Sequence, residues 1–212
     1  MAIWFFKPNA IKEASRKMSK YKIIAICGKS ASGKDTLLHR IIEYNPNLHE
    51  IVSCTTRPPR EGEINGKNYF FLTLEEFAHK DCMGDMLEVT HFRDWYYGTS
   101  LDGLSREAIN VGVFNPAGIY NLMKNDMVDL FVIQVQASDK TRLMRSLKRE
   151  INPDVEEIVR RYLTDKEDFE LFSQVYEPDY IFDSDGVSFS ELNGAAREVV
   201  SLSQRHWAEE TN

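Results

Sequence analysis

The sequence lacks the features of a secreted or membrane-spanning protein. Its 212 residues include only three cysteines, Cys27, Cys54 and Cys82, and no two of them have the C-x-x-C spacing of a zinc site or a disulfide framework. The longest apolar run near the N-terminus, Ile3–Phe6, is far too short for a signal-peptide core or a membrane span. We therefore expect a protein of a reducing compartment, cytoplasmic and without membrane contact.

An excess of positive charge is missing as well. Lys and Arg total 26 against 33 Asp and Glu, which gives a formal net charge of −7. This balance argues against a broad basic face, so we expect no polymeric nucleic acid as partner. The five histidines have no metal-ligand spacing, and a hydrophobic content of 42% excludes wholesale disorder. What remains is one domain that binds small ligands with a few well-placed cations, as a monomer or a homodimer.

From residue 22 onward, apolar runs alternate with helical patterns. Buried strands are predicted at residues 22–27, 51–54, 130–135 and 179–183, and helices at 34–44, 138–149, 153–172 and 188–207. Between them, strand patterns at 69–72, 86–92 and 95–99 surround a small helix at 73–80. The alternation predicts an α/β fold with a parallel sheet flanked by helices and a β-rich insert at about 50–100.

Two local signals refine this prediction. Asn65-Gly66 between extended runs indicates a hairpin. Asn152 can cap the helix that follows it, with Pro153 at the first helical position. Residues 1–20 precede the first strand and are interpreted as an N-terminal extension, either one amphipathic helix or a partly ordered tail.

A glycine-rich loop follows the first strand and opens the first helix. The pattern G-x-x-x-x-G-K in this context is typical of a P-loop, whose backbone N–H groups and helix dipole bind the phosphates of a nucleotide. The alternative is a glycine-rich turn without a ligand. Asp35 stands where the strict pattern has Ser or Thr, so Thr36 is the predicted metal-side hydroxyl. The predicted ATP-binding residues are Gly28, Lys29, Ser30, Ala31, Ser32, Gly33, Lys34, Asp35 and Thr36.

A second anion site is indicated by Arg57 and Arg60, which bracket a stiff Pro-Pro unit. Two guanidinium forks and the Tyr69 hydroxyl suit a dianionic phosphate, although solvated loop arginines are the alternative. Residues 53–71 strongly resemble guanylate kinases, which carry S-x-T-T-R-x-P-R-x-G-E-x-N-G-x-x-Y-x-F after a P-loop unit. The resemblance extends from about residue 22 to the C-terminus.

This resemblance implies a guanylate-kinase-like domain over residues 21–212, with a monophosphate-binding region at about 50–100 and a lid at about 145–160. It implies ATP and Mg²⁺ as cosubstrate and cofactor, and GMP or dGMP as acceptor. The implied phosphate ligands of the acceptor are Arg57, Arg60, Tyr69 and Tyr97, and the implied guanine contacts are Ser53, Glu88, Thr99 and Asn115. The implied catalytic cations are Lys34, Arg145, Arg149 and Arg160.

The sequence departs from the family where an Asp-x-Asp pair is expected, because Val113 and Asn115 stand there. The first Asp of that pair lies on the metal side and the second contacts guanine. Two alternatives to GMP phosphorylation therefore stay open. One is a nucleoside monophosphate kinase of broader or different base specificity, and the other is a non-catalytic binding module of the same fold, against which the intact P-loop argues.

Overall fold

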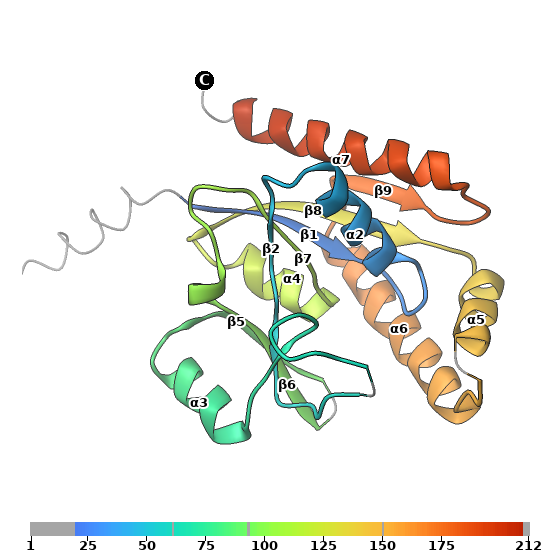
Figure 1. The fold of residues 1–212 in the computed structure, drawn as a ribbon, viewed down its shortest axis with the longest axis horizontal. Coiled ribbons are helices and arrows are strands. Elements are labelled where there is room, and N and C mark those ends of the chain that lie inside the picture. Colours follow the sequence, from blue (N-terminus) through green and yellow to red (C-terminus); the bar gives the residue numbers. More distant parts are fainter. Residues whose placement is uncertain (1–19, 61, 93, 150, 210–212) are drawn as a thin grey trace, which may run out of the picture.

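The computed structural model describes residues 20–60, 62–92, 94–149 and 151–209. Of the predicted N-terminal extension, residues 1–19 lie outside this range. Figure 1 shows the larger of two sheets beneath the C-terminal helix α7 (Phe189–Glu209), with a second, β-rich region at the opposite end of the molecule. The two regions meet at the loops that carry the candidate site.

The larger sheet has five parallel strands in the order β2-β7-β1-β8-β9. They are β1 Tyr21–Cys27, β2 His49–Glu50, β7 Asn110–Val113, β8 Val128–Gln136 and β9 Tyr180–Asp183. The predicted α/β fold with a parallel sheet flanked by helices is confirmed. Because β1 is the central strand, the loop that follows it leaves from the middle of the sheet edge, where α/β proteins commonly bind ligands.

Helices cover both faces of this sheet. They are α2 Lys34–Tyr44 and α7 on one face and α4 Pro116–Met123 and α6 Val155–Val175 on the other, while α5 Asp139–Lys148 lies beyond the end of β8 and packs against α6. Ile24 and Ile26 of β1 pack in one core cluster with α2 and α7, whereas Ile23 and Ala25 pack in the other with α4 and α6. This alternation is the two-residue period of a strand buried on both faces.

The smaller sheet has the strand order β4-β3-β6-β5. Its strands are β3 Cys54–Thr55, β4 Phe70–Phe71, β5 Met86–Phe92 and β6 Trp95–Ser100. Helix α3 Leu74–Cys82 precedes β5, and a 3₁₀ turn at Leu101–Gly103 follows β6. Thr73 and Glu76 form a capping box that starts α3. A register shift interrupts the β5–β6 pairing between Met86 and Glu88, next to a predicted base contact.

Three local predictions were wrong. The apolar run at 51–54 is not one strand, because Ile51 still bonds to Val111 of the larger sheet and the chain enters the smaller sheet only at Cys54. The Asn65-Gly66 turn forms, with Gly66 at φ 77°, but it makes no hairpin because β3 and β4 pair in parallel. The α6 cap is Asp154, whose side chain accepts from the Glu157 N–H, and not Asn152.

Candidate active site

The P-loop connects β1 to α2 in a turn that requires both of its glycines. A Cβ on Gly28 would lie 2.5 Å from Ser32 Oγ and 2.5 Å from the Val135 carbonyl oxygen. Gly33 has φ 97° and caps α2, and Ala31 also has a positive φ of 60°. The chain therefore curls back over the N-terminus of α2, which is the geometry of an anion-binding loop.

Lys34 lies in the first turn of α2 and lines a cavity together with Gly28 and Ser30 of the loop. The Asp35 carboxylate is 3.6 Å from Lys34 Nζ and 71% exposed. Thr36 is also exposed. The first turn thus presents one ammonium group and two oxygen-bearing side chains close to the loop.

The same cavity, with a volume of about 230 Å³, extends from the P-loop into the smaller sheet. Several predicted acceptor ligands line it, namely Ser53, Tyr69, Glu88, Tyr97 and Asn115. Val113 lines it as well, at the end of β7. Residues from widely separated parts of the chain, from Gly28 to Phe169, are therefore brought to one opening beside Lys34.

Arg57 is held beside this cavity by its neighbours. Its Nη2 donates to Glu63 Oε1 at 2.8 Å, its Nη1 donates to the Pro58 carbonyl, and its guanidinium lies 5.5 Å from the Tyr69 ring centroid. Burial opposes the charge, but the hydrogen bond from Arg57 to Glu63 raises the pKa of Arg57. The same hydrogen bond lowers the pKa of Glu63. Arg57 is therefore a fixed cation that is paired with the Glu63 carboxylate.

Arg60 differs from Arg57 because it is exposed and its side chain sits among positive charges. Desolvation lowers the pKa of Arg60, and so do the positive charges of Arg161 and Arg57. Only its backbone N–H is tied to Glu63, at 2.6 Å. Arg60, Arg57 and Arg161 thus form a cationic group that is suited to an anion arriving from solvent.

Glu88 lies in the deeper part of the cavity and is 8% exposed. Its Oε1 accepts from the Thr99 hydroxyl at 3.0 Å. Burial raises the pKa of Glu88 to about 7, although hydrogen bonds from Thr99 act in the opposite direction. A protonated Glu88 would be a weak acceptor for the N–H groups of a ligand. The Glu88 carboxyl group therefore reaches its full hydrogen-bonding strength only when it ionises.

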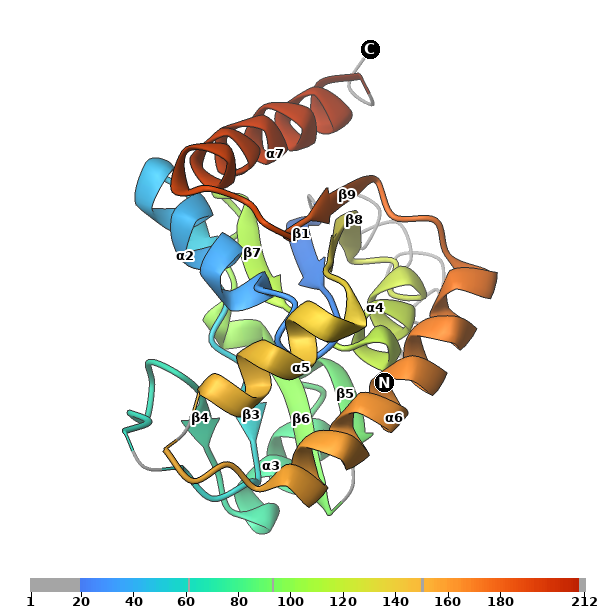
Figure 2. The ribbon, with the colours of Figure 1, turned by 90° about the vertical axis from the view of Figure 1, so that its right-hand side faces the viewer.

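The lid arginines predicted from the sequence take different positions. Arg145 reaches the P-loop, where its Nη1 donates to the Ser32 carbonyl at 3.2 Å and to Ser184 Oγ at 3.0 Å. Arg149 lines a small cavity of about 60 Å³ with Ser30 and Ala31. Both residues belong to α5, Arg145 within the helix and Arg149 at its C-terminal cap, and Figure 2 shows α5 beside α6 near the smaller sheet.

Arg160, by contrast, lies on the outer side of α6. Its side chain is 63% exposed and pairs with Glu157 one turn earlier. Arg161 lines the small cavity beside the P-loop together with Arg149. Its positive charge lowers the pKa of Arg60. Successive helical residues point about 100° apart, so the two adjacent arginines line different surfaces although both pair with Glu157. The sequence pattern could not distinguish them.

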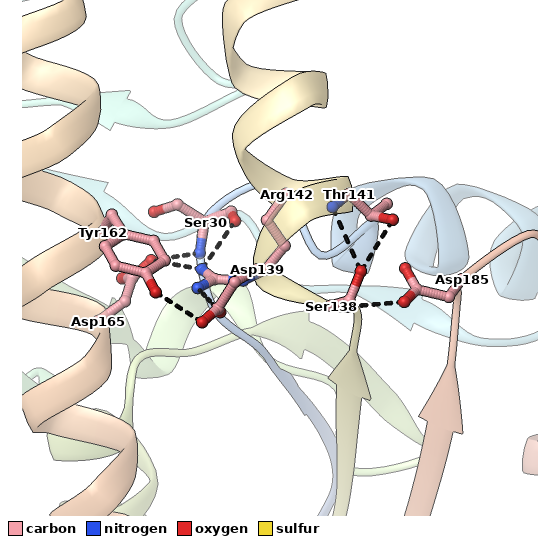
Figure 3. A network of polar contacts seen from close by, with 8 residues as sticks. All are labelled: Ser30, Ser138, Asp139, Thr141, Arg142, Tyr162, Asp165 and Asp185. Carbon is pink, nitrogen blue, oxygen red and sulfur yellow. Dashed lines mark hydrogen bonds and ion pairs between the residues drawn. The ribbon is translucent and has the colours of Figure 1, made fainter.

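Sequence reasoning also missed a polar network that ties α5 and α6 to the P-loop (Figure 3). The Ser30 N–H donates to Asp165 Oδ2 at 2.6 Å. Arg142, only 2% exposed, pairs with Asp139 at 2.9 Å and with Asp165 at 3.5 Å, and donates to the Ser30 carbonyl oxygen. Tyr162 donates to Asp139 at 2.5 Å. A buried arginine with carboxylates from two helices therefore fixes the outer side of the loop.

Comparisons with known proteins agree with this geometry. The family model described as guanylate kinase matches residues 20–191. Human guanylate kinase is 30% identical over 195 residues, which cover 89% of this chain and 98% of that protein. Guanylate kinase from Nostoc sp. is 42% identical over 78 residues, and this match spans 37% of this chain and only 39% of the relative's length.

A solved structure shows the same fold. The crystal structure of guanylate kinase from Anaplasma phagocytophilum aligns with a TM-score of 0.60 at 20% identity, covering 89% of this chain and 87% of that chain. The family model spans most of the present chain, and the human relative covers nearly its full length. The chain therefore belongs to the guanylate kinase family.

Proposed function

We propose that this protein transfers the γ-phosphoryl group of ATP to the phosphate of GMP or dGMP, giving ADP and GDP or dGDP. The observation that carries the proposal is the continuous cavity that joins Lys34 of the P-loop to Glu88 in the smaller sheet. A donor nucleotide on the loop and an acceptor base at Glu88 would point their phosphates toward one another. The guanylate kinase names of the relatives support this assignment.

Each end of the cavity would hold one nucleotide. The P-loop amides and Lys34 bind the phosphates of ATP. Arg57, Arg60, Tyr69 and Tyr97 bind the phosphate of the acceptor, and Ser53, Glu88, Thr99 and Asn115 surround its base. The ionised Glu88 accepts from guanine N1–H, a donor that adenine and cytosine do not present at that position.

The chemistry then needs positioning and positive charge more than proton transfer. The acceptor phosphate is already an ionised nucleophile, so no general base is required. Negative charge spreads over the equatorial oxygens of the transferred group, and Lys34, Arg145 and Arg149 stabilise it. We assign the third lid cation to Arg161, because it lines the loop-side cavity and Arg160 does not.

The residues present are compatible with Mg²⁺. Among the described residues, no group of three or more His, Cys, Asp or Glu side chains forms a metal cage. Magnesium in kinases is held mostly by phosphates and water with one or two protein oxygens, and Asp35 and Thr36 offer such oxygens beside Lys34. When bound, the ion would neutralise charge on the ATP phosphates.

The proposed function also involves closure of the lid and a cytoplasmic location. Closure of α5 and the start of α6, the lid at about 145–160, over the region at about 50–100 would exclude water and limit ATP hydrolysis. The three cysteines are free thiols, which supports the proposed reducing, cytoplasmic setting. No helix in the described ranges is long and apolar enough to cross a membrane.

An acceptor panel tests the proposed function. Purified protein with ATP and Mg²⁺ is offered the eight common ribo- and deoxynucleoside monophosphates, and ADP release is followed in a coupled assay. We expect turnover with GMP and dGMP. ADP release that neither GMP nor dGMP stimulates would remove the proposal, and Lys34→Ala serves as the inactive control.

A further inference from the structure

The side-chain amide of Asn115 has a defined orientation, and it faces the base end of the cavity. Asn115 caps α4, and its Oδ1 accepts from the Gly118 N–H at 2.7 Å. A backbone N–H can only donate, so the atom that it contacts must be the carbonyl oxygen and not the amide nitrogen. Nδ2 therefore points the other way, toward Thr90 Oγ1 at 3.4 Å. Asn115 presents a donor to the cavity because its acceptor is committed to the helix.

Glu88 supplies an acceptor next to this donor. Glu88 Oε2 and Asn115 Oδ1 approach the same point beside Gly118, lying 3.5 Å and 3.2 Å from where a Cβ on that glycine would stand. Both residues line the cavity together with Thr90. The Thr90 hydroxyl takes one of the two Nδ2 hydrogens, which leaves the second hydrogen for a ligand. The wall of the cavity thus offers an acceptor and a donor side by side.

This pair of groups discriminates between purines at the 2-position. Guanine presents two adjacent donors, N1–H and the 2-amino group. Guanine N1–H can donate to Glu88. The 2-amino group, however, faces the Asn115 N–H, and two donors cannot form a hydrogen bond. Xanthine presents N1–H next to a 2-carbonyl oxygen, so the same two side chains accept from the first group and donate to the second. Asn115 therefore removes the advantage that a second acceptor at this place would give guanine over xanthine.

We propose that Asn115 is a specificity-determining residue that extends the acceptors of this protein to 6-oxopurine monophosphates with a 2-carbonyl group, such as xanthosine monophosphate. The inference rests on the proposed function and concerns the base that its acceptor site admits. It requires that an acidic residue at position 115 restore selectivity for guanine. Aspartate would keep one oxygen for the Gly118 N–H and place a second acceptor toward the 2-amino group.

The experiment compares GMP with xanthosine monophosphate in the parent protein, in Asn115→Asp and in a matched control, Asn65→Asp. Asn65 Oδ1 likewise accepts from a backbone N–H, that of Phe71, but Asn65 does not line the cavity. We expect parent kcat/KM values for the two acceptors within about tenfold of each other. Asn115→Asp should raise the ratio of GMP to xanthosine monophosphate roughly 10- to 100-fold, and the control should leave it unchanged.

Two further measurements keep the inference separate from the proposed function. Titration calorimetry with each monophosphate alone measures its Kd. The ratio of the two Kd values reports the preference between GMP and xanthosine monophosphate even if neither is turned over. Asn115→Ser, which keeps a helix cap and replaces the amide with a shorter hydroxyl group, should weaken only xanthosine monophosphate and covers the case in which Asn115→Asp does not fold. A parent that binds and turns over GMP but excludes xanthosine monophosphate, with a ratio that Asn115→Asp does not move, would overturn the inference and leave the proposed function intact.

Discussion

Glu88→Gln should stabilise the ligand-free protein at high pH, although it removes a group of the base site. Burial raises the pKa of Glu88 from 4.5 to about 7, because the ionised carboxylate has lost water that Thr99 only partly replaces. At 1.36 kcal/mol per pKa unit, ionised Glu88 costs the fold about 3 kcal/mol. Glutamine has a similar shape, keeps an oxygen for the Thr99 hydroxyl and carries no charge, so it avoids that cost.

The sign of the pH dependence follows from the direction of the shift. The folded protein binds the Glu88 proton more tightly than the unfolded chain does. Its stabilising effect is therefore fully present below about pH 4.5 and is lost as the pH rises through about 7. Glu88→Gln should match the parent near pH 4.5 and exceed it by up to about 3 kcal/mol at pH 8, which corresponds to a Tm increase of about 6–12 °C.

Thermal unfolding followed by circular dichroism between pH 4.5 and 8 measures the effect. Glu177→Gln is the matched control, because Glu177 is exposed and lies away from the cavity. The same Glu88→Gln protein should lose most of its affinity for GMP, since the amide cannot replace a carboxylate as acceptor from N1–H. A Tm difference between Glu88→Gln and the parent that is the same at every pH would refute the reasoning.

Other predictions follow from the same geometry. Arg161→Ala should lower kcat at least 100-fold whereas Arg160→Ala changes it less than threefold, and steady-state kinetics that rank them in reverse would contradict the assignment of the lid cation. Asp165→Asn should cost about 1–3 kcal/mol and lower Tm by about 2–12 °C, because buried Arg142 loses one of its two carboxylate partners, and unchanged unfolding would argue against the network. Cys82 should react quickly with a thiol reagent while Cys27, whose pKa burial raises to about 12, stays unmodified, and equal rates would contradict the buried position.

The sequence could predict what depends on local pattern. The P-loop follows from a glycine spacing between an apolar run and a helical run, and Lys34 occupies the place that this spacing predicts. The approximate bounds of β5 and β6 follow from alternation and turn residues. The acceptor residues that line the cavity came from the resemblance to a family, which is most specific at residues 53–71 and extends to the C-terminus, since no local pattern brings Ser53, Glu88 and Asn115 together.

The remaining features depend on rotation and packing that no local pattern fixes. Which of Arg160 and Arg161 faces the loop depends on how α6 is placed, and α6 begins at Val155 after an Asp154 cap rather than after Asn152. Arg142 reads as a surface residue of an amphipathic helix, yet the packing of α6 against α5 buries it. The donor that Asn115 presents follows from the cap of α4, a helix that the sequence pattern did not indicate.

The most direct test of the central claim is transfer of label from ATP to a guanine nucleotide. With ATP labelled at the γ-phosphate, GMP and Mg²⁺, the account predicts that the label appears in GDP and that free phosphate stays at background. Lys34→Ala should abolish this transfer, because the cation beside the loop is lost. Label that appears only as inorganic phosphate, or in GDP equally with Lys34→Ala, would contradict the account.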